Sequence, residues 1–336
     1  MTKAPTELAE EVREQVKDRG SYHGVIDRLN KASVDKHWEA YVDIPWDDPE
    51  LQIDPNDPRW ILGEMDQLGR TEWYRSQPVE IQAQIGLWRV ATAMKIGLQF
   101  ENLLKRGLLN YAYWLPNGRP EFRYVYHETT EECHHGMMFQ EFVNRTKMPI
   151  RGMPRALTTL AQVAPWIPLV NTELFFIFVL GGEDPIDYVQ RKNLKGGHIK
   201  HPLEEMIMKI HIAEEARHIS FARHYLKHRV PNLSKGRRRA IGIASPLILG
   251  WMARIMLSPP GPMVKRFNIP PEVVREAYKD GAHMDEVSDS VGKVRDLMFE
   301  LGLITPVNRR LWKALGIWDE PKQRRTNTRR RAPKAA

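Results

Sequence analysis

Apolar residues recur at spacings of three and four along most of the chain, which is the period of a helix with at least one buried face. Five long stretches follow this pattern: residues 78–109, 121–145, 168–180, 202–229 and 235–257. Weaker helical patterns follow at residues 271–280 and 285–301. Regular alternation of apolar and polar positions, the signal for strands, is scarce. The pattern therefore predicts an all-α protein.

The regions on either side of these helices differ from them in composition. Residues 1–75 contain one predicted amphipathic helix, near Leu8–Lys17, and then a segment rich in Pro and Asp that is typical of turns. We therefore expect an N-terminal arm at residues 1–75, a helical bundle domain at residues 76–316 and a basic, disordered tail at residues 317–336.

Two apolar stretches are candidates for membrane spans, Ala156–Gly182 and Ala240–Ala253. The first contains Glu173 and two prolines, and the second is only 14 residues long, whereas a span needs about 20 apolar residues. We expect both to be helices buried inside a large helical protein. The second follows a basic cluster, so an alternative is that it lies on a membrane surface.

Composition and charge exclude several classes of protein. The chain has 336 residues, of which 42% are hydrophobic and 27% charged, as in ordinary globular proteins. A single cysteine, Cys133, excludes an internal disulfide framework and any Cys-rich metal site. The net charge is +8, but residues 321–336 contribute seven positive charges and no negative one, which leaves 8 − 7 = +1 for the rest. The basic tail could contact an anionic membrane, and nucleic acid is a less favoured partner.

The first 20 residues are charged throughout and lack the apolar core of a signal peptide. We therefore expect a cytoplasmic protein, with a peripheral position at the inner face of the membrane as the alternative.

Two of the long helices contain a Glu-x-x-His motif, Glu132/His135 and Glu215/His218. Residues three apart share a helix face, so the carboxylate and the imidazole of each motif can bind one ion. Two further acids stand in apolar surroundings on the other two long helices: Glu101 and Glu173. An unpaired buried carboxylate is costly, so each must be neutral, paired or bound to metal. The order Glu, Glu-x-x-His, Glu, Glu-x-x-His is that of a dimetal carboxylate bundle.

Each of these residues alone has a simpler interpretation, as a surface acid or a hydrogen-bonded core histidine. Together they would require four unrelated coincidences on four helices. Carboxylates and imidazoles without thiolates favour two iron ions, with manganese as the alternative, over structural zinc. Dioxygen is the natural co-substrate of a pair of ferrous ions.

His211 stands four residues before Glu215 and seven before His218, so all three share one stripe of a helix. It is either a core histidine near the site or a third imidazole ligand. With it, the set Glu101, Glu132-x-x-His135, Glu173, His211-x-x-x-Glu215-x-x-His218 resembles the p-aminobenzoate N-oxygenase (AurF-like) family of non-haem di-iron oxygenases in the ferritin-like superfamily. The resemblance covers about residues 80–230.

The resemblance implies a ferritin-like or ribonucleotide-reductase-like bundle with extra N- and C-terminal helices, a di-iron centre, dioxygen as co-substrate and a homodimer. Described members oxidise arylamines to hydroxylamines or nitro compounds. It also implies that Glu131 and Glu214, which precede the motif glutamates, each hydrogen-bond the histidine of the opposite motif. Cys133 and His134 lie on other faces of the helix, so we do not expect them to bind metal.

The neighbours of Glu101 and Glu173 predict an apolar substrate pocket that includes Gly97, Leu98, Phe176 and Ile177. No Gly-x-Gly-x-x-Gly motif is present, so electrons must come from an external donor such as a reductase or ferredoxin. The leading hypothesis is a monooxygenase that inserts oxygen into an amine or an apolar substrate. The alternatives are a di-iron desaturase or hydroxylase of acyl chains, and a non-enzymatic helical protein at a membrane surface.

Overall fold

A computed structural model describes residues 21–279 and 281–319 of the chain. The predicted helix near Leu8–Lys17 and residues 320–336 of the basic tail lie outside the described residues. In the described ranges the secondary structure consists of α-helices and short 3-10 helices, with no strand. The prediction of an all-α protein is therefore confirmed.

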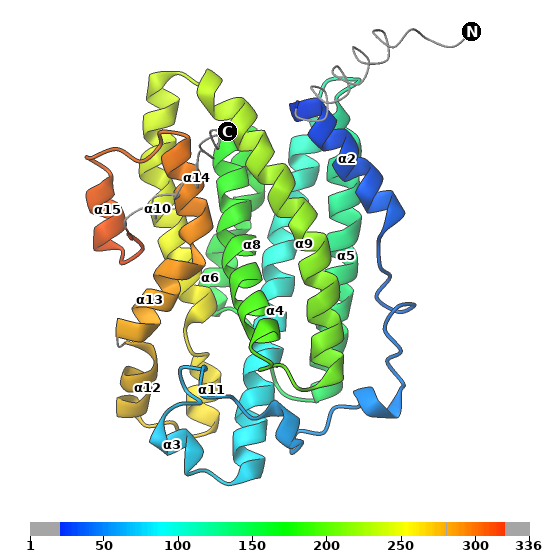
Figure 1. Cartoon of the computed structure of the whole chain (residues 1–336), viewed down its shortest axis with the longest axis vertical. Coiled ribbons are helices and arrows are strands. Elements are labelled where there is room, and N and C mark those ends of the chain that lie inside the picture. Colours follow the sequence, from blue (N-terminus) through cyan, green and yellow to red (C-terminus); the bar gives the residue numbers. More distant parts are fainter. Residues whose placement is uncertain (1–20, 280, 320–336) are drawn as a thin grey trace, which may run out of the picture.

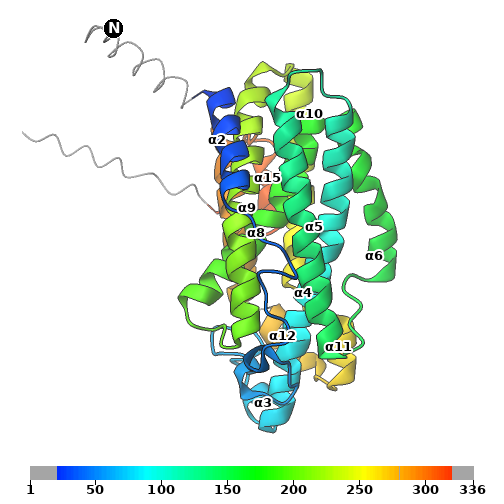
Figure 2. The same ribbon diagram turned by 90° about the vertical axis from the view of Figure 1, so that its right-hand side faces the viewer.

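Four long helices form the centre of the molecule (Figures 1 and 2). They are α4 (Val79–Tyr113), α5 (Pro120–Thr146), α8 (Thr172–Lys195) and α9 (Pro202–Arg229). Helix α4 packs along α5, and α8 packs along α9. A fifth helix, α10 (Lys235–Leu257), covers the outer side of α8. This is the ferritin-like bundle that the sequence predicts.

Helix α8 differs most from its expected bounds. The sequence predicts a helix over residues 168–180 that ends at Gly181-Gly182, but α8 continues through both glycines and Pro185 to Lys195. The two glycines allow close packing instead of ending the helix. A Cβ atom on Gly182 would lie 2.0 Å from Cζ of Phe100 on α4, and one on Gly181 would lie 2.9 Å from Cδ2 of Leu249 on α10.

The segment before α8 corrects a second expectation. Residues 155–170 form α6 (Arg155–Leu160), the 3-10 helix η3 (Ala161–Trp166) and α7 (Ile167–Val170), which lie on the outside of α4 (Figure 2). Leu160, Val163 and Trp166 are each about 60% exposed, at 61%, 62% and 61%. The first half of the apolar stretch is therefore a surface element, and only its second half, in α8, is buried.

The N-terminal arm contains more helix than the sequence predicts. Its described part includes α2 (Tyr22–Asp35), η1 (Pro49–Leu51), η2 (Pro58–Trp60) and α3 (Glu72–Arg75). Ser21 caps α2 by accepting a hydrogen bond from the backbone N–H of Gly24. Helix α2 packs on α5 and α9, and the arm then runs to the opposite end of the bundle, next to the start of α4 (Figure 1).

After α9, the 3-10 helix η4 (Val230–Asn232) leads into α10, and shorter helices then pack beside α10 and α8. These shorter helices are α11 (Gly261–Arg266), α12 (Pro271–Tyr278), α13 (Gly281–Ser290), α14 (Gly292–Glu300) and α15 (Arg309–Ala314). The helix predicted at residues 285–301 is interrupted at Val291, between α13 and α14. Ile317 is fully buried, so the packed part of the chain extends past residue 316.

One helical stretch in the described part, Lys235–Arg266, has the length and composition of a membrane span, with a mean hydropathy of 1.7. Core helices of soluble proteins have the same property, and 44% of its most apolar window is buried in the protein. This stretch is therefore weak support for a membrane position.

Candidate metal centre

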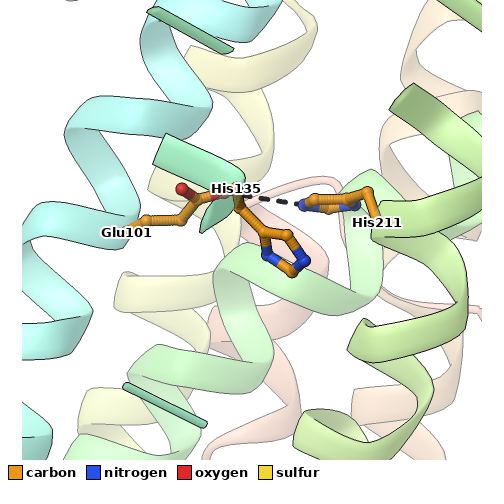
Figure 3. Close-up of side chains that lie close together, drawn as sticks. All are labelled: Glu101, His135 and His211. Carbon is orange, nitrogen blue, oxygen red and sulfur yellow. Dashed lines mark ion pairs between the residues drawn. The ribbon is translucent and has the colours of Figure 1, made fainter. Parts of the chain in front are cut away.

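The four central helices bring seven buried side chains together in two adjoining groups. Glu101, His135 and His211 form one group (Figure 3), and Glu132, Glu183, Glu215 and His218 form the other. Within each group the candidate ligand atoms lie within 4.8 Å of one another. Six of these seven residues are the ones that the sequence predicts, and Glu183 is the exception.

Two carboxylates lie between the groups. Oε1 of Glu215 is 3.4 Å from Nδ1 of His218, 3.5 Å from Nε2 of His211 and 3.6 Å from Nδ1 of His135. Glu132 also faces both sides, with its oxygens 3.0 Å from Nδ1 of His218 and 3.8 Å from Nδ1 of His135. Glu132 and Glu215 therefore face histidines of both groups.

Several of these atoms have no hydrogen-bond partner although they are fully buried. They are Oε2 of Glu101, both oxygens of Glu132 and of Glu183, Oε2 of Glu215, and Nδ1 of His135 and His218. Buried polar atoms are normally hydrogen-bonded, so a cluster of unpaired acceptors that face one another calls for cations. Four carboxylates balance the charge of two divalent ions, and the donor set of oxygen and imidazole nitrogen suits iron. The residues therefore fit a di-iron centre.

The opposite nitrogens of two histidines are held by the acids that precede the motif glutamates. Nε2 of His135 lies 2.8 Å from Oε2 of Glu214, and Nε2 of His218 lies 2.8 Å from Oε2 of Glu131. Each acid thus contacts the histidine of the other motif. A proton held at Nε2 leaves Nδ1 of each ring free to bind metal.

A buried arginine joins these two acids, and sequence reasoning gave it no role. Nη2 of Arg217 lies 2.9 Å from Oε1 of Glu131 and 3.3 Å from Oε1 of Glu214. Arg217 is 9% exposed, so its charge is largely shielded from water and neutralises the two acids. The only sequence signal for it is its place between Glu214 and His218.

The third histidine has a different orientation. Nδ1 of His211 is 2.9 Å from the side-chain oxygen of Gln190 on α8, so its Nε2 faces the centre, 3.6 Å from Oε1 of Glu101. Figure 3 shows His211 reaching toward Glu101 from the facing helix. The group of Glu101, His135 and His211 therefore has two imidazoles, whereas the other group has one.

Glu173 does not join the centre, which corrects the sequence-based ligand set. Its oxygens lie 3.5 Å from Nε of Arg229 and 3.4 Å from Nη2 of Arg237, so its buried charge is paired with arginines. Glu183 stands ten residues later on α8, about 15 Å along the helix axis. The sequence-based choice fell on Glu173 because the helix was expected to end before Glu183.

The surroundings shift the pKa values of the ligands in opposite directions. Burial, together with the charge of Glu132, raises the pKa of Glu101 to about 8. Burial also raises the pKa of Glu183 well above its ordinary value. Burial favours the protonated form of Glu132 too, but the imidazoles of His135 and His218 outweigh it and hold its pKa low. Burial lowers the pKa of His211 to about 4, which keeps this imidazole neutral, as metal binding requires.

A pocket of about 260 Å³ extends from the metal centre toward the end of the bundle where α4 begins. His211 and Gly97 lie in its wall at the metal end. The N-terminal arm contributes Trp60 and its neighbours, and the end of α10 contributes Met256 and Leu257. The arm and the end of α10 therefore both help to enclose the pocket.

Of the four predicted pocket residues, only Gly97 lies in this wall. Leu98 instead faces Gly136 on α5. Phe176 and Ile177 are fully buried in the hydrophobic core, where Phe176 packs on Tyr225. They surround the level of Glu173, whereas the pocket lies beyond Glu183. Because the sequence prediction chose Glu173 in place of Glu183, it also placed the substrate pocket at the wrong level of the bundle.

Comparison with known proteins gives one family and three relatives. The family described as p-aminobenzoate N-oxygenase AurF matches residues 19–302. The relatives are uncharacterized proteins of Mycobacterium bovis and of two strains of Mycobacterium tuberculosis. Each is 42% identical over 325 residues, which cover 96% of this chain and 95% of the relative. No solved structure matches the chain.

Proposed function

Because the chain belongs to the p-aminobenzoate N-oxygenase AurF family, we propose that it is a di-iron monooxygenase that uses dioxygen to oxidise the nitrogen of an amine. Membership of the family supports an oxygenase in general. Oxidation of an amine nitrogen by this chain is our proposal. The observation that carries it is the double group of buried carboxylates and imidazoles whose inward-facing atoms lack hydrogen-bond partners.

The residues divide the work as follows. Glu101, His135 and His211 would hold one iron, and Glu132, Glu183, Glu215 and His218 would hold the other. When bound, the irons supply the activation of dioxygen. Glu131 and Glu214 hold protons at Nε2 of the two motif histidines, and the side-chain oxygen of Gln190 holds the proton at Nδ1 of His211. The apolar part of the pocket wall limits access of water to the bound amine.

Two partners follow from the same proposal. An external reductase or ferredoxin supplies electrons, since the sequence shows no dinucleotide-binding motif. The active form is a homodimer, and the exposed apolar side chains of Leu160, Val163 and Trp166 offer a surface for it. A sedimentation mass equal to one chain would contradict the homodimer.

The alternative reaction is desaturation or hydroxylation of an acyl chain. The pocket favours an amine over an acyl chain. The pocket is small, and its wall includes several charged side chains, among them Arg89, Lys192 and Glu204. A long acyl chain needs a longer and wholly apolar channel.

The ligand assignment can be tested with a matched pair of substitutions on α8. We expect the protein to bind about two ferrous ions per chain. Glu183→Gln should lower the iron content to about one ion or less and abolish dioxygen consumption, because it removes a ligand. Glu173→Gln should keep the full iron content, because Glu173 contacts arginines and not the centre. Metal analysis of the purified variants measures both.

The reaction itself is tested with iron-loaded protein, a chemical reductant, dioxygen and aniline. Mass spectrometry should detect the hydroxylamine, and His211→Ala should abolish it. A protein that binds iron only in traces, or that binds iron but consumes no dioxygen, would refute the proposed function.

A further inference from the structure

One face of α9 connects the metal centre to the far wall of the pocket. Glu204, Met208 and His211 follow one another at spacings of four and three, so they share that face. All three lie in the pocket wall. Glu204 is seven residues from His211, about 10 Å along the helix axis. A ligand that reaches from the irons to Glu204 must therefore be elongated.

The carboxyl group of Glu204 lines the pocket and is unpaired. It is half-buried, and within the described residues it has no hydrogen bond or ion pair. Burial raises its pKa to about 8, and no neighbouring charge offsets this effect. A carboxyl group in such surroundings is stabilised when a positive charge or a hydrogen-bond donor reaches it.

The positive side chains of the pocket wall, in contrast, already have partners. Arg59 lies 2.6 Å from Asp57, and Lys192 lies 2.7 Å from Glu286. Arg89 pairs with Asp66. Among the charged residues that the structure describes in this wall, Glu204 is the one without an ionic partner. The wall therefore offers a ligand one unpaired carboxyl group, which becomes ionised when a cation reaches it, and no unpaired Lys or Arg side chain.

Apolar side chains make up much of the wall, among them Met94, Phe139, Val189 and Met208. Met208 stands between Glu204 and His211 on α9. The pocket thus requires an apolar middle section in the ligand, flanked by an end at the irons and an end at Glu204.

We propose that this pocket binds an elongated amine with an apolar centre and a second, positively charged nitrogen at its far end, and that Glu204 binds this second nitrogen. The identity of the near end as the reacting amine rests on the proposed function. The assignment of a positively charged nitrogen to the far end rests on the residues of the pocket wall alone. This class excludes substrates with a carboxylate at the far end, because such a group would meet Glu204 and find no free cation.

Two probes of equal size test the proposal: 4-aminobenzylamine and 4-aminobenzoate. Both carry the same aromatic amine, and they differ in the sign of the charge at the opposite end. Their affinities for the iron-loaded, full-length protein are measured by calorimetry without oxygen. We expect 4-aminobenzylamine to bind at least about tenfold more tightly, because a charge-assisted hydrogen bond to a carboxylate is worth this much.

Two variants locate the effect. Glu204→Gln should lower the preference for 4-aminobenzylamine by about tenfold or more, while Glu204→Asp should retain part of it. Glu205→Gln is the matched control, because Glu205 lies in the same first turn of α9 but pairs with Lys209 and is absent from the pocket wall. The control should keep the full preference. Thermal unfolding of each variant verifies that it is folded.

Equal or tighter binding of 4-aminobenzoate to the unsubstituted protein would overturn the proposal, whether or not the variants fold. An unchanged preference in Glu204→Gln would also overturn it. The readout is separate from turnover: selective binding of 4-aminobenzylamine without oxidation would retain this inference and refute the proposed function. Oxidation of aniline without a preference for 4-aminobenzylamine would support the proposed function and refute this inference.

Discussion

Glu173 and Glu183 stand ten residues apart on α8, and only their surroundings tell them apart. Both are buried, at 1% and 3% exposure. Apolar neighbours in the sequence show that an acid is buried, but not what neutralises it. The arginines that pair with Glu173 come from the end of α9 and the start of α10, more than fifty residues away. The Glu-x-x-His motifs were predictable because their partners are local and the helix period fixes their geometry.

At the residue scale, Glu204 gives a prediction about pH. Its folded-state pKa is about 8, against an ordinary value of 4.5. Between these values the unfolded chain releases the proton and the folded chain keeps it, so stability falls as pH rises from about 4.5 to about 8. The Glu204→Gln variant has no carboxyl group at this position, so its stability does not fall in this way. Its melting temperature should exceed that of the unsubstituted protein at pH 8, and the difference should shrink toward pH 5.

Thermal unfolding scans of both proteins across this pH range measure the effect. Glu205→Gln again serves as the control, because Glu205 pairs with Lys209 and does not line the pocket. A constant gap between Glu204→Gln and the unsubstituted protein would mean that the carboxyl of Glu204 is not withdrawn from water.

At the scale of elements, helix ends limited by proline were predicted well, and glycines were misleading. The predicted ranges 202–229 and 235–257 coincide with α9 and α10. At Gly181-Gly182 the expected stop is absent, because the glycines accommodate Phe100 and Leu249 from neighbouring helices. A glycine that ends a helix and a glycine that admits a neighbour look the same in a single sequence. The surface position of α6 and α7 was missed for a related reason. An apolar sequence alone does not show whether other parts of the protein cover the helix.

Gly182→Ala tests the packing role of this position. Its added methyl group would collide with Phe100, so we expect a loss of about 1–3 kcal/mol in the free energy of unfolding. Gly236→Ala in α10 is the control, because no atom lies within 4 Å of its Cβ position. There the better helix propensity of alanine should stabilise the protein by up to about 1 kcal/mol. Urea unfolding measures both, and equal effects would contradict the packing role.

At the scale of the whole molecule, the centre ties together α4, α5, α8 and α9 through four buried carboxylates. Without metal, buried oxygen atoms of these carboxyl groups lack hydrogen-bond partners. Removal of iron with a chelator should therefore lower the free energy of unfolding, by about 2.7 kcal/mol if the iron is at 100 times its dissociation constant. Hydrogen exchange should accelerate in these four helices and stay unchanged in α14 and α15. Identical melting curves with and without iron would contradict the centre.

The pocket is walled by parts of the chain that lie outside the predicted bundle motif. Trp60 and Gln67 of the arm, Met256 and Leu257 at the end of α10, and Glu286 of α13 all border it, whereas every proposed metal ligand lies between residues 101 and 218. Glu204 and the ligands share one stretch of the sequence, but these flanking segments contribute wall residues and no proposed ligand. Substitutions in them should therefore change which molecules the pocket accepts while the ligand set stays intact.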